Sequence, residues 1–388
     1  MDEVRNPFAP GAGSRPPELA GRDEIVKSAQ TAITRIVARR AAQSQILLGL
    51  RGVGKTVLLN AIQEIAEANH CATSFIEAPE SNSLVDLLYP RLFQVLRRLS
   101  LREKSKHAAH AGLKALKSFA GAFKVKVGDI EIAVDPEPGS ADSGNLEYDL
   151  SELFLRVGRA AADAGIGWIL LVDEVQYLKS EELAALIVAL HQVSQKGLPV
   201  LFFGAGLPQL AALAGEAKSY AERLFLYPHV GALDPAAARE AVRGPVEAEH
   251  ESISQDALDR IAAQTERYPY FLQEWGYQAW NAADASPIDR DDVDAASVAA
   301  TRRLDQGFFK VRFDRLTPKE REYVIAMATL GKGPYRSSDV ADILKLEPNS
   351  LGPRRASIIA KGIIYSPAYG DIAFTVPMFE GYLRRNWM

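Results

Sequence analysis

The sequence predicts an α/β protein built on a parallel sheet, followed by a helical segment and a small C-terminal module. From Gln45 onward, short apolar strands alternate with amphipathic helices, which is typical of a parallel sheet with helices on both faces. From Asp234 the strands stop and one helical pattern follows another. The chain has 388 residues, and at roughly 100–200 residues per domain this length corresponds to two or three domains.

The expected elements follow one another along the chain. A stretch rich in Pro and Gly precedes the first helix, expected at residues 23–40. The expected strands are residues 45–49, 73–77, 168–173, 199–204 and 224–230. An insertion, residues 97–147, separates the second and third strands and contains a basic helical piece (97–123), a hairpin (124–134) and a Pro/Gly/Ser linker (136–145). Because the insertion is additional to the alternating pattern, we expect it to form a partner-specific surface.

The composition excludes several classes of protein. Hydrophobic residues make up 47% of the chain and charged residues 24%, which excludes extended disorder. The single cysteine, Cys71, excludes an internal disulfide and a cysteine-based zinc site. No apolar run approaches the roughly 20 residues of a membrane helix, and the start of the chain lacks a signal-peptide pattern. We therefore expect a cytoplasmic protein.

The charge is distributed unevenly. Residues 301–388 contain 15 Lys or Arg and 9 Asp or Glu, a net charge of +6, which leaves 30 against 40 for the first 300 residues. A basic end on an acidic body favours a module that faces nucleic acid.

A glycine-rich segment follows the first strand. Residues 49–56, GLRGVGKT, match the pattern G-x-x-x-x-G-K-[ST], in which glycines turn backbone N–H groups towards one phosphate and the next helix adds its N-terminal end. Lys55 would reach the β- and γ-phosphates of ATP, and the Thr56 hydroxyl would hold Mg²⁺. A chance glycine turn is the alternative, and the strand before and helix after the segment weigh against it. The nucleotide-binding residues expected here are Gly49, Gly52, Val53, Gly54, Lys55, Thr56 and Val57.

Two acidic residues end the third strand. Asp173 and Glu174 follow the apolar run at residues 169–172, and ligands of open α/β sheets bind at this edge. Asp173 would orient Mg²⁺, and Glu174 would polarise the attacking water. The alternative is a strand that simply ends in two solvated acids.

With these motifs in place, the chain resembles the AAA+ ATPases, in the bacterial and archaeal branch related to the origin-recognition and cell-division-cycle initiators and near the STAND ATPases. The start of the chain resembles the box that closes over adenine, with Leu19, Gly21 and Arg22 in matching places. SYAERLF resembles the arginine-finger segment and assigns that role to Arg223, for which a solvated or internally paired arginine is the alternative. ERYPYFLQEWGYQAW looks like the lid motif.

Two departures from the family pattern indicate slow turnover. The fourth strand ends in Gly204-Ala205-Gly206, and the first polar side chain after it is Gln209, although brisk ATPases of this family carry a polar sensor residue there. In the lid, Tyr270 stands where the initiator pattern has an arginine.

The last segment has the pattern of a winged helix-turn-helix. Thr317 and Glu320 form a capping box for a helix to about residue 330, and helices are expected at residues 338–346 and 350–361, followed by two strands around residues 368–371. A third helix of this kind enters the DNA major groove. The side chains expected to face DNA are Arg354, Arg355, Lys361 and Arg336. Docking of protein, or of the chain's own acidic body, is the alternative.

The resemblance implies a P-loop NTPase core with an AAA+-type five-stranded parallel sheet over residues 1–233, a helical lid over 234–315 and a winged-helix domain over 316–388. We expect a hydrolase that binds Mg-ATP and couples its hydrolysis to DNA binding or remodelling, with duplex DNA, further copies of the chain or another protein as partners. The alternatives are a nucleotide-gated STAND-like signalling or scaffold protein with slow turnover, whose winged helix docks protein, and a plain DNA-binding regulator.

Overall fold

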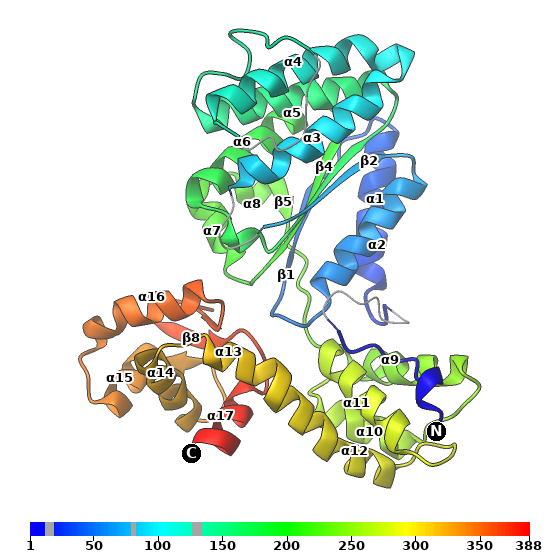
Figure 1. Cartoon of the computed structure of the whole chain (residues 1–388), viewed down its shortest axis with the longest axis vertical. Helices are drawn as coiled ribbons and strands as arrows, with labels where there is room; N and C mark the ends of the chain where they lie inside the picture. The colour runs from blue at the N-terminus through cyan, green and yellow to red at the C-terminus, as the bar shows by residue number, and fades with distance from the viewer. Residues whose placement is uncertain (12–18, 79–82, 126–133) are drawn as a thin grey trace.

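The computed structural model describes residues 1–11, 19–78, 83–125 and 134–388. Most of the hairpin expected at residues 124–134 lies outside these ranges. In the described part, the sheet and its helices form one body, and the helical segment and C-terminal module lie side by side below it (Figure 1). No described helix is long and apolar enough to cross a membrane.

A five-stranded parallel sheet forms the centre of the first body, in the order β2-β3-β4-β1-β5. All five predicted strands are present, and β5 is much shorter than expected, since after two residues only an isolated bridge from Leu48 to His229 continues it. The strands β1, β3 and β4 are completely buried, as expected for a sheet covered on both faces. The strands are β1 (Ser44–Leu48), β2 (Ala72–Glu77), β3 (Trp168–Asp173), β4 (Val200–Gly206) and β5 (Phe225–Leu226).

Helices cover both faces of the sheet, because alternate side chains of each strand point to opposite sides. In β3, Ile169 and Leu171 pack with α1 (Asp23–Val37) and α2 (Lys55–Ala68). Leu170 and Val172 belong to the cluster on the other face. The helices of that face include α3 (Leu84–Ser100), α4 (Lys106–Ala122), α5 (Leu146–Asp163), α6 (Ser180–Gln195) and α7 (Leu210–Ala217).

The basic helical piece predicted at residues 97–123 is not one helix. Arg97 and Arg98 form the last turn of α3, and a short turn at Glu103–Ser105 (η2) separates them from α4. Leu113 and Phe119 of α4 are buried in the same cluster as α3 and α5. This part of the insertion is therefore packed into the core of the first body.

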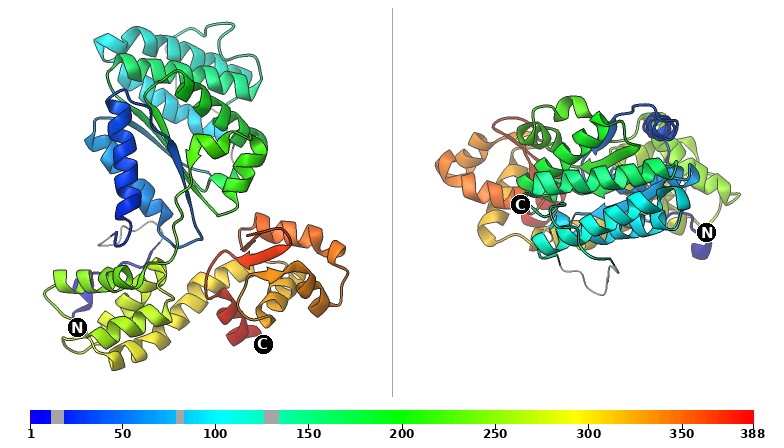
Figure 2. Two further views of the ribbon diagram at one scale, coloured as in Figure 1. Left: turned by 180° about the vertical axis from the view of Figure 1, so that it is seen from behind. Right: turned by 90° about the horizontal axis from the view of Figure 1, so that it is seen from above.

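The helical segment predicted from Asp234 is present, and Asp234 caps its first helix by accepting hydrogen bonds from Ala236 and Ala237. Residues from the very start of the chain pack on it: Phe8 is buried against Gly276, and the chain's N-terminus lies beside this segment in two views (Figures 1 and 2). We call this segment the lid. Its elements are α9 (Pro235–Ala248), α10 (Gln255–Gln264), α11 (Pro269–Ala282), α12 (Arg290–Arg303), the π-helical turn η4 (Leu304–Phe309) and α13 (Lys310–Asp314).

The C-terminal module has four α-helices, one short helical turn (η5) and a small antiparallel sheet in the order β6-β8-β7. The capping box between Thr317 and Glu320 is formed as predicted. The strand β6 and the final helix α17 were not predicted. The elements are α14 (Pro318–Thr329), β6 (Tyr335–Arg336), α15 (Ser337–Leu344), η5 (Pro348–Leu351), α16 (Gly352–Ala360), β7 (Ile364–Tyr365), β8 (Asp371–Phe374) and α17 (Phe379–Trp387).

Candidate functional site

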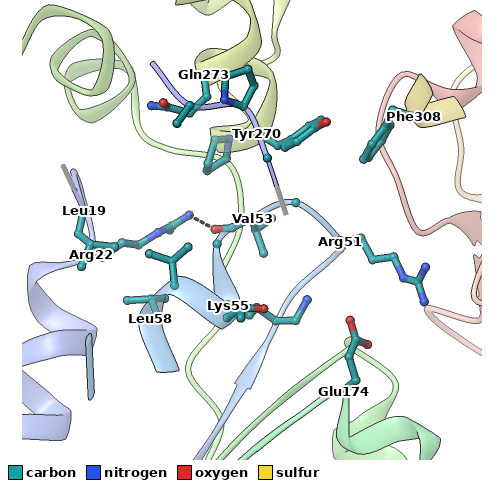
Figure 3. A pocket seen from close by; sticks show the side chains of 18 of the residues that line it. Leu19, Arg22, Arg51, Val53, Lys55, Leu58, Glu174, Tyr270, Gln273 and Phe308 are labelled. Carbon is teal, nitrogen blue, oxygen red and sulfur yellow. Dashed lines mark hydrogen bonds between the residues drawn. The ribbon is translucent and has the colours of Figure 1, made fainter. Parts of the chain in front are cut away.

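A cavity of about 510 Å³ opens where the carboxyl ends of β1 and β3 meet the lid, and this volume lies within the range of small-molecule sites. The N-terminal segment, the loop after β1, the end of β3 and the lid, including α13, all line it. Leu19 and Arg22 lie on one side, and Lys55, Arg51 and Glu174 gather on the other (Figure 3). We call this second side the cationic end.

The loop between β1 and α2 is shaped by its glycines. A Cβ on Gly49 would lie 2.1 Å from the Val230 carbonyl oxygen, so only glycine fits there. Gly54, immediately before α2, has φ +89°, which is a left-handed conformation that L side chains avoid. Of the predicted loop residues, Gly52, Val53, Gly54, Lys55, Thr56 and Val57 line the cavity, whereas Gly49 does not. Gly49 therefore shapes the loop by packing against Val230, on the side away from the cavity.

The Lys55 ammonium is buried at the cationic end. Its Nζ donates to the carbonyls of Gly49, at 3.0 Å, and Leu50, at 2.9 Å. Burial lowers the pKa of Lys55, and the carboxylates of Glu174 and Asp173 oppose this shift. An ammonium has three N–H donors, so one remains for a ligand.

Thr56 and Asp173 form a pair of oxygen donors. The Thr56 hydroxyl donates to Asp173 Oδ2, and Asp173 Oδ1 accepts from the Glu174 amide at 2.8 Å. Burial raises the pKa of Asp173, which the Thr56 hydrogen bond opposes. The described residues contain no cluster of three or more His, Cys, Asp or Glu side chains suited to a metal. One carboxylate and a hydroxyl nevertheless fit Mg²⁺, which keeps several waters and binds substrate phosphates.

Glu174 lines the cavity directly after Asp173. Its backbone is left-handed, with φ +54°, and its carboxylate accepts a hydrogen bond from Gln176 Nε2. Gln176 Oε1 in turn accepts from the Leu207 amide at 3.2 Å, just beyond β4. Gln176 therefore occupies the end of the fourth strand, where the sequence offered only glycine and alanine, and it orients Glu174.

The opposite side of the cavity contains the predicted adenine box. Leu19 lines it, and the buried Arg22 guanidinium donates to the carbonyls of Val53, at 3.3 Å, and Gly231. Burial lowers the pKa of Arg22. Arg22 thus ties the N-terminal segment to the loop after β1 (Figure 3).

The lid and the C-terminal module also reach the loop. The Tyr270 amide donates to the Gly52 carbonyl at 3.2 Å, and the Arg51 amide donates to the Thr375 carbonyl at 3.1 Å. The Arg51 side chain donates to the Tyr177 hydroxyl. Arg312, on α13, also lines the cavity. Neither Arg51 nor Arg312 was predicted, since Arg51 occupies a variable position of the pattern at residues 49–56 and Arg312 belongs to no motif.

Arg223, the predicted arginine finger, lies outside the cavity. It is exposed on the short helix α8 (Ala221–Leu224) and does not line the cavity. Its backbone carbonyl accepts a hydrogen bond from Gln43. An arginine-finger role would therefore require a second copy of the chain, and it stays a prediction.

Three of the four basic side chains expected to face DNA are engaged by other residues of the protein. Lys361 does not present a free ammonium: it bonds to the buried Glu320 at 2.6 Å and to the Arg315 carbonyl at 3.0 Å. Arg336 pairs with Asp371 at 3.2 Å, although two thirds of its side chain is exposed. Arg355 donates to the Ser337 hydroxyl at 3.0 Å. Arg354, like Arg355, is half-buried.

Known proteins share this fold. The family model of the AAA ATPase domain matches residues 18–203, and a family described as a domain of unknown function, DUF8462, matches residues 306–383. A Walker-type ATPase of Pyrococcus abyssi is 16% identical, with a TM-score of 0.57, covering 94% of this chain and 96% of its own. The ADP form of the ORC2 protein of Aeropyrum pernix is 12% identical, with a TM-score of 0.53, covering 97% of each chain. None of the curated proteins matches the sequence significantly.

Proposed function

The chain carries an AAA+ P-loop ATPase domain over residues 18–203, and from this premise we propose that it binds Mg-ATP in the cavity and hydrolyses it slowly. The observation that carries the proposal is the convergence of Lys55, the Thr56–Asp173 pair and Glu174 at the carboxyl ends of β1 and β3. Phosphoryl transfer needs positioned charges more than covalent chemistry, and these residues supply them.

Each residue has a distinct task in this proposal. The backbone N–H groups of the loop and the start of α2 bind the phosphates, and the remaining N–H of Lys55 reaches the β- and γ-phosphates. Thr56 and Asp173 would hold Mg²⁺, which neutralises charge on the phosphate oxygens when it is bound. Glu174, oriented by Gln176, accepts a hydrogen bond from the attacking water. Leu19 and Arg22 close the adenine side.

The residues at the end of β4 and at the start of α11 support slow turnover. β4 ends in Gly204, Ala205 and Gly206, which have no polar side chain. The Gln176 side chain lies at this strand end instead, and its amide group is hydrogen-bonded to the Glu174 carboxylate and to the Leu207 N–H. Tyr270 begins the lid helix and packs on Phe308, with ring centroids 4.7 Å apart. Neither Gln176 nor Tyr270 supplies a positive charge for the developing phosphate.

The C-terminal module supports a nucleotide-gated role more strongly than a constitutive DNA-binding role. It contacts the P-loop through Thr375 and Arg51, and Lys361, Arg355 and Arg336 are engaged within the module. The order of its elements supports the predicted winged helix, which stays a prediction. A net charge of +6 over residues 301–388 favours DNA contact as the second candidate.

Calorimetric titration with ATP and with ADP, in the presence and absence of Mg²⁺, tests the proposal. Wild type should bind both nucleotides, K55A should lose binding, and E174Q should retain binding while losing turnover.

Titration with duplex DNA at two salt concentrations, with an R354Q/R355Q variant for comparison, tests the second candidate function, because contacts to DNA phosphates weaken as the salt concentration rises. Full nucleotide binding by K55A would refute the proposed site.

A further inference from the structure

Arg312 occupies an unusual place in the fold. It lies on α13, the five-residue helix that ends the lid and leads into the C-terminal module, and its side chain lines the cavity. It is 261 residues away from Arg51 in the chain, yet the two guanidinium groups interact electrostatically. Arg312 therefore lies near the cationic end rather than the adenine side.

The Arg312 side chain is held in one orientation. Its guanidinium carbon lies 3.8 Å from the centre of the Phe308 ring, and Nη1 donates to the Phe308 carbonyl at 2.7 Å. Phe308 stacks in turn on Tyr270, which hydrogen-bonds to the P-loop through its amide. A guanidinium fixed on an aromatic face loses less conformational entropy when it binds an anion.

Two buried donors at this end of the cavity lack partners. Nε of Arg312 and Nε of Arg51 are buried, and neither has a hydrogen-bond acceptor within the described part of the chain. Burial, with Arg51 and Arg315 nearby, lowers the pKa of Arg312 to about 10, so it stays charged at neutral pH. The two neighbouring positive charges also repel each other. Buried charge without an opposite charge beside it is costly, and an anion in the cavity would relieve this cost.

The same arginines connect the cavity with the C-terminal module. Arg51 donates its amide to Thr375 in the module, and its Nη2 lies so close to Gly362 that a Cβ there would come within 2.6 Å. Arg312 belongs to the helix that leads directly into the module. A ligand that binds both side chains would therefore tie the P-loop, the lid junction and the module together.

We propose that Arg312, together with Arg51, binds the terminal phosphate of a nucleoside triphosphate, and that this contact holds the C-terminal module against the P-loop. The inference rests on the proposed function, because it assumes that the nucleotide occupies this cavity. A nucleoside diphosphate lacks the terminal phosphate that Arg312 binds, so the contact between the module and the P-loop is weaker when ADP is bound.

The test compares R312Q with a matched control in the same part of the protein. Arg321 also lies over an aromatic ring, at 5.0 Å from the Phe313 centre, and also donates to a backbone carbonyl, but it does not line the cavity. Titration with Mg²⁺ and the non-hydrolysable analogue AMP-PNP, and separately with ADP, gives the dissociation constants. R312K keeps the charge without the guanidinium fork and is the conservative variant.

R312Q should weaken AMP-PNP binding about 10- to 100-fold, the range for one hydrogen bond to a charged group, and should change ADP binding less than about 3-fold. R312K should fall between wild type and R312Q, and R321Q should match wild type.

Energy transfer between dyes attached to two exposed positions, in the variants K104C and Y369C, reports the distance between the first body and the C-terminal module. The native Cys71 is buried and should not react with the dyes. AMP-PNP should raise the transfer above its value with ADP in wild type and R321Q, and not in R312Q.

Equal losses of AMP-PNP and ADP affinity in R312Q, or none, would overturn the inference and reduce Arg312 to a packing residue. An unchanged nucleotide response of the energy transfer in R312Q would overturn it too. In either case, loss of binding by K55A would leave the proposed function standing. Wild-type protein that binds neither nucleotide would overturn both.

Discussion

Gly362→Ala should loosen the contact between the C-terminal module and the P-loop. Gly362 has φ +63°, and a Cβ there would lie 2.6 Å from Arg51 Nη2 and 2.8 Å from Tyr177 Oη. The left-handed backbone costs alanine about 1–2 kcal/mol. Displacing Arg51 from the Tyr177 hydroxyl adds a cost of about 1.5–3 kcal/mol, the range for a hydrogen bond to a charged group. We expect a total loss of about 2.5–5 kcal/mol.

Gly370→Ala is the matched control. Gly370 has φ +81°, and the nearest atom to its Cβ position is Arg336 Nη1 at 3.7 Å, an ordinary contact. This variant should lose only the backbone contribution of about 1–2 kcal/mol. Urea unfolding gives the free energies, and titration with AMP-PNP shows whether Arg51 has moved. Equal destabilisation by the two variants, with unchanged nucleotide affinity in both, would refute the docking of the module on the P-loop.

Three further predictions concern single side chains. Burial raises the pKa of the Glu320 carboxyl, but hydrogen bonds from Lys361, Ser357 and the Thr317 amide outweigh it and lower this pKa to about 2. At about 1.4 kcal/mol per pH unit, the shift stabilises the fold by about 3 kcal/mol. Since this pKa is depressed, the advantage over Glu320→Gln in urea unfolding should be complete above about pH 5 and vanish as the pH falls towards about 2, and a constant difference would contradict this. Phe8→Ala should lower the free energy of unfolding by about 3–5 kcal/mol and make residues 1–11 accessible to proteases. Unchanged proteolysis would show that the contact of Phe8 with Gly276 does not hold this segment on the lid. Thr56→Val should weaken nucleotide binding with Mg²⁺ present and leave Mg²⁺-free binding unchanged; an equal effect on both would remove the metal role.

The core of the fold was predictable because its signals are local. Each of the five strands is an apolar run bounded by turn residues, and the pattern at residues 49–56 fixes its own strand–loop–helix setting. The Thr317–Glu320 capping box was predictable for the same reason. The winged-helix interpretation and the roles of the site residues remain predictions.

The features that the sequence did not reveal depend on distant contacts. β6 has two residues, too few for a periodic pattern. Lys361 was expected to face DNA, but Glu320, 41 residues earlier, draws its ammonium inward. Arg51 stands at a variable position of the phosphate-binding pattern, and Arg312 resembles an ordinary surface arginine, but the lid brings both to one cavity. Phe8 packs on Gly276, a contact that no local pattern indicates.

Steady-state ATP hydrolysis by wild type, Glu174→Gln and Lys55→Ala, measured with Mg²⁺ at two protein concentrations and with or without duplex DNA, tests the central claim most directly. We expect slow turnover in wild type, tight nucleotide binding without turnover in Glu174→Gln, and neither in Lys55→Ala. A rate that rises with protein concentration would support a role for Arg223 in a second copy, and stimulation by DNA would support the second candidate function. Wild-type turnover that persists in Glu174→Gln and Lys55→Ala would contradict the assignment of this cavity as the ATPase site.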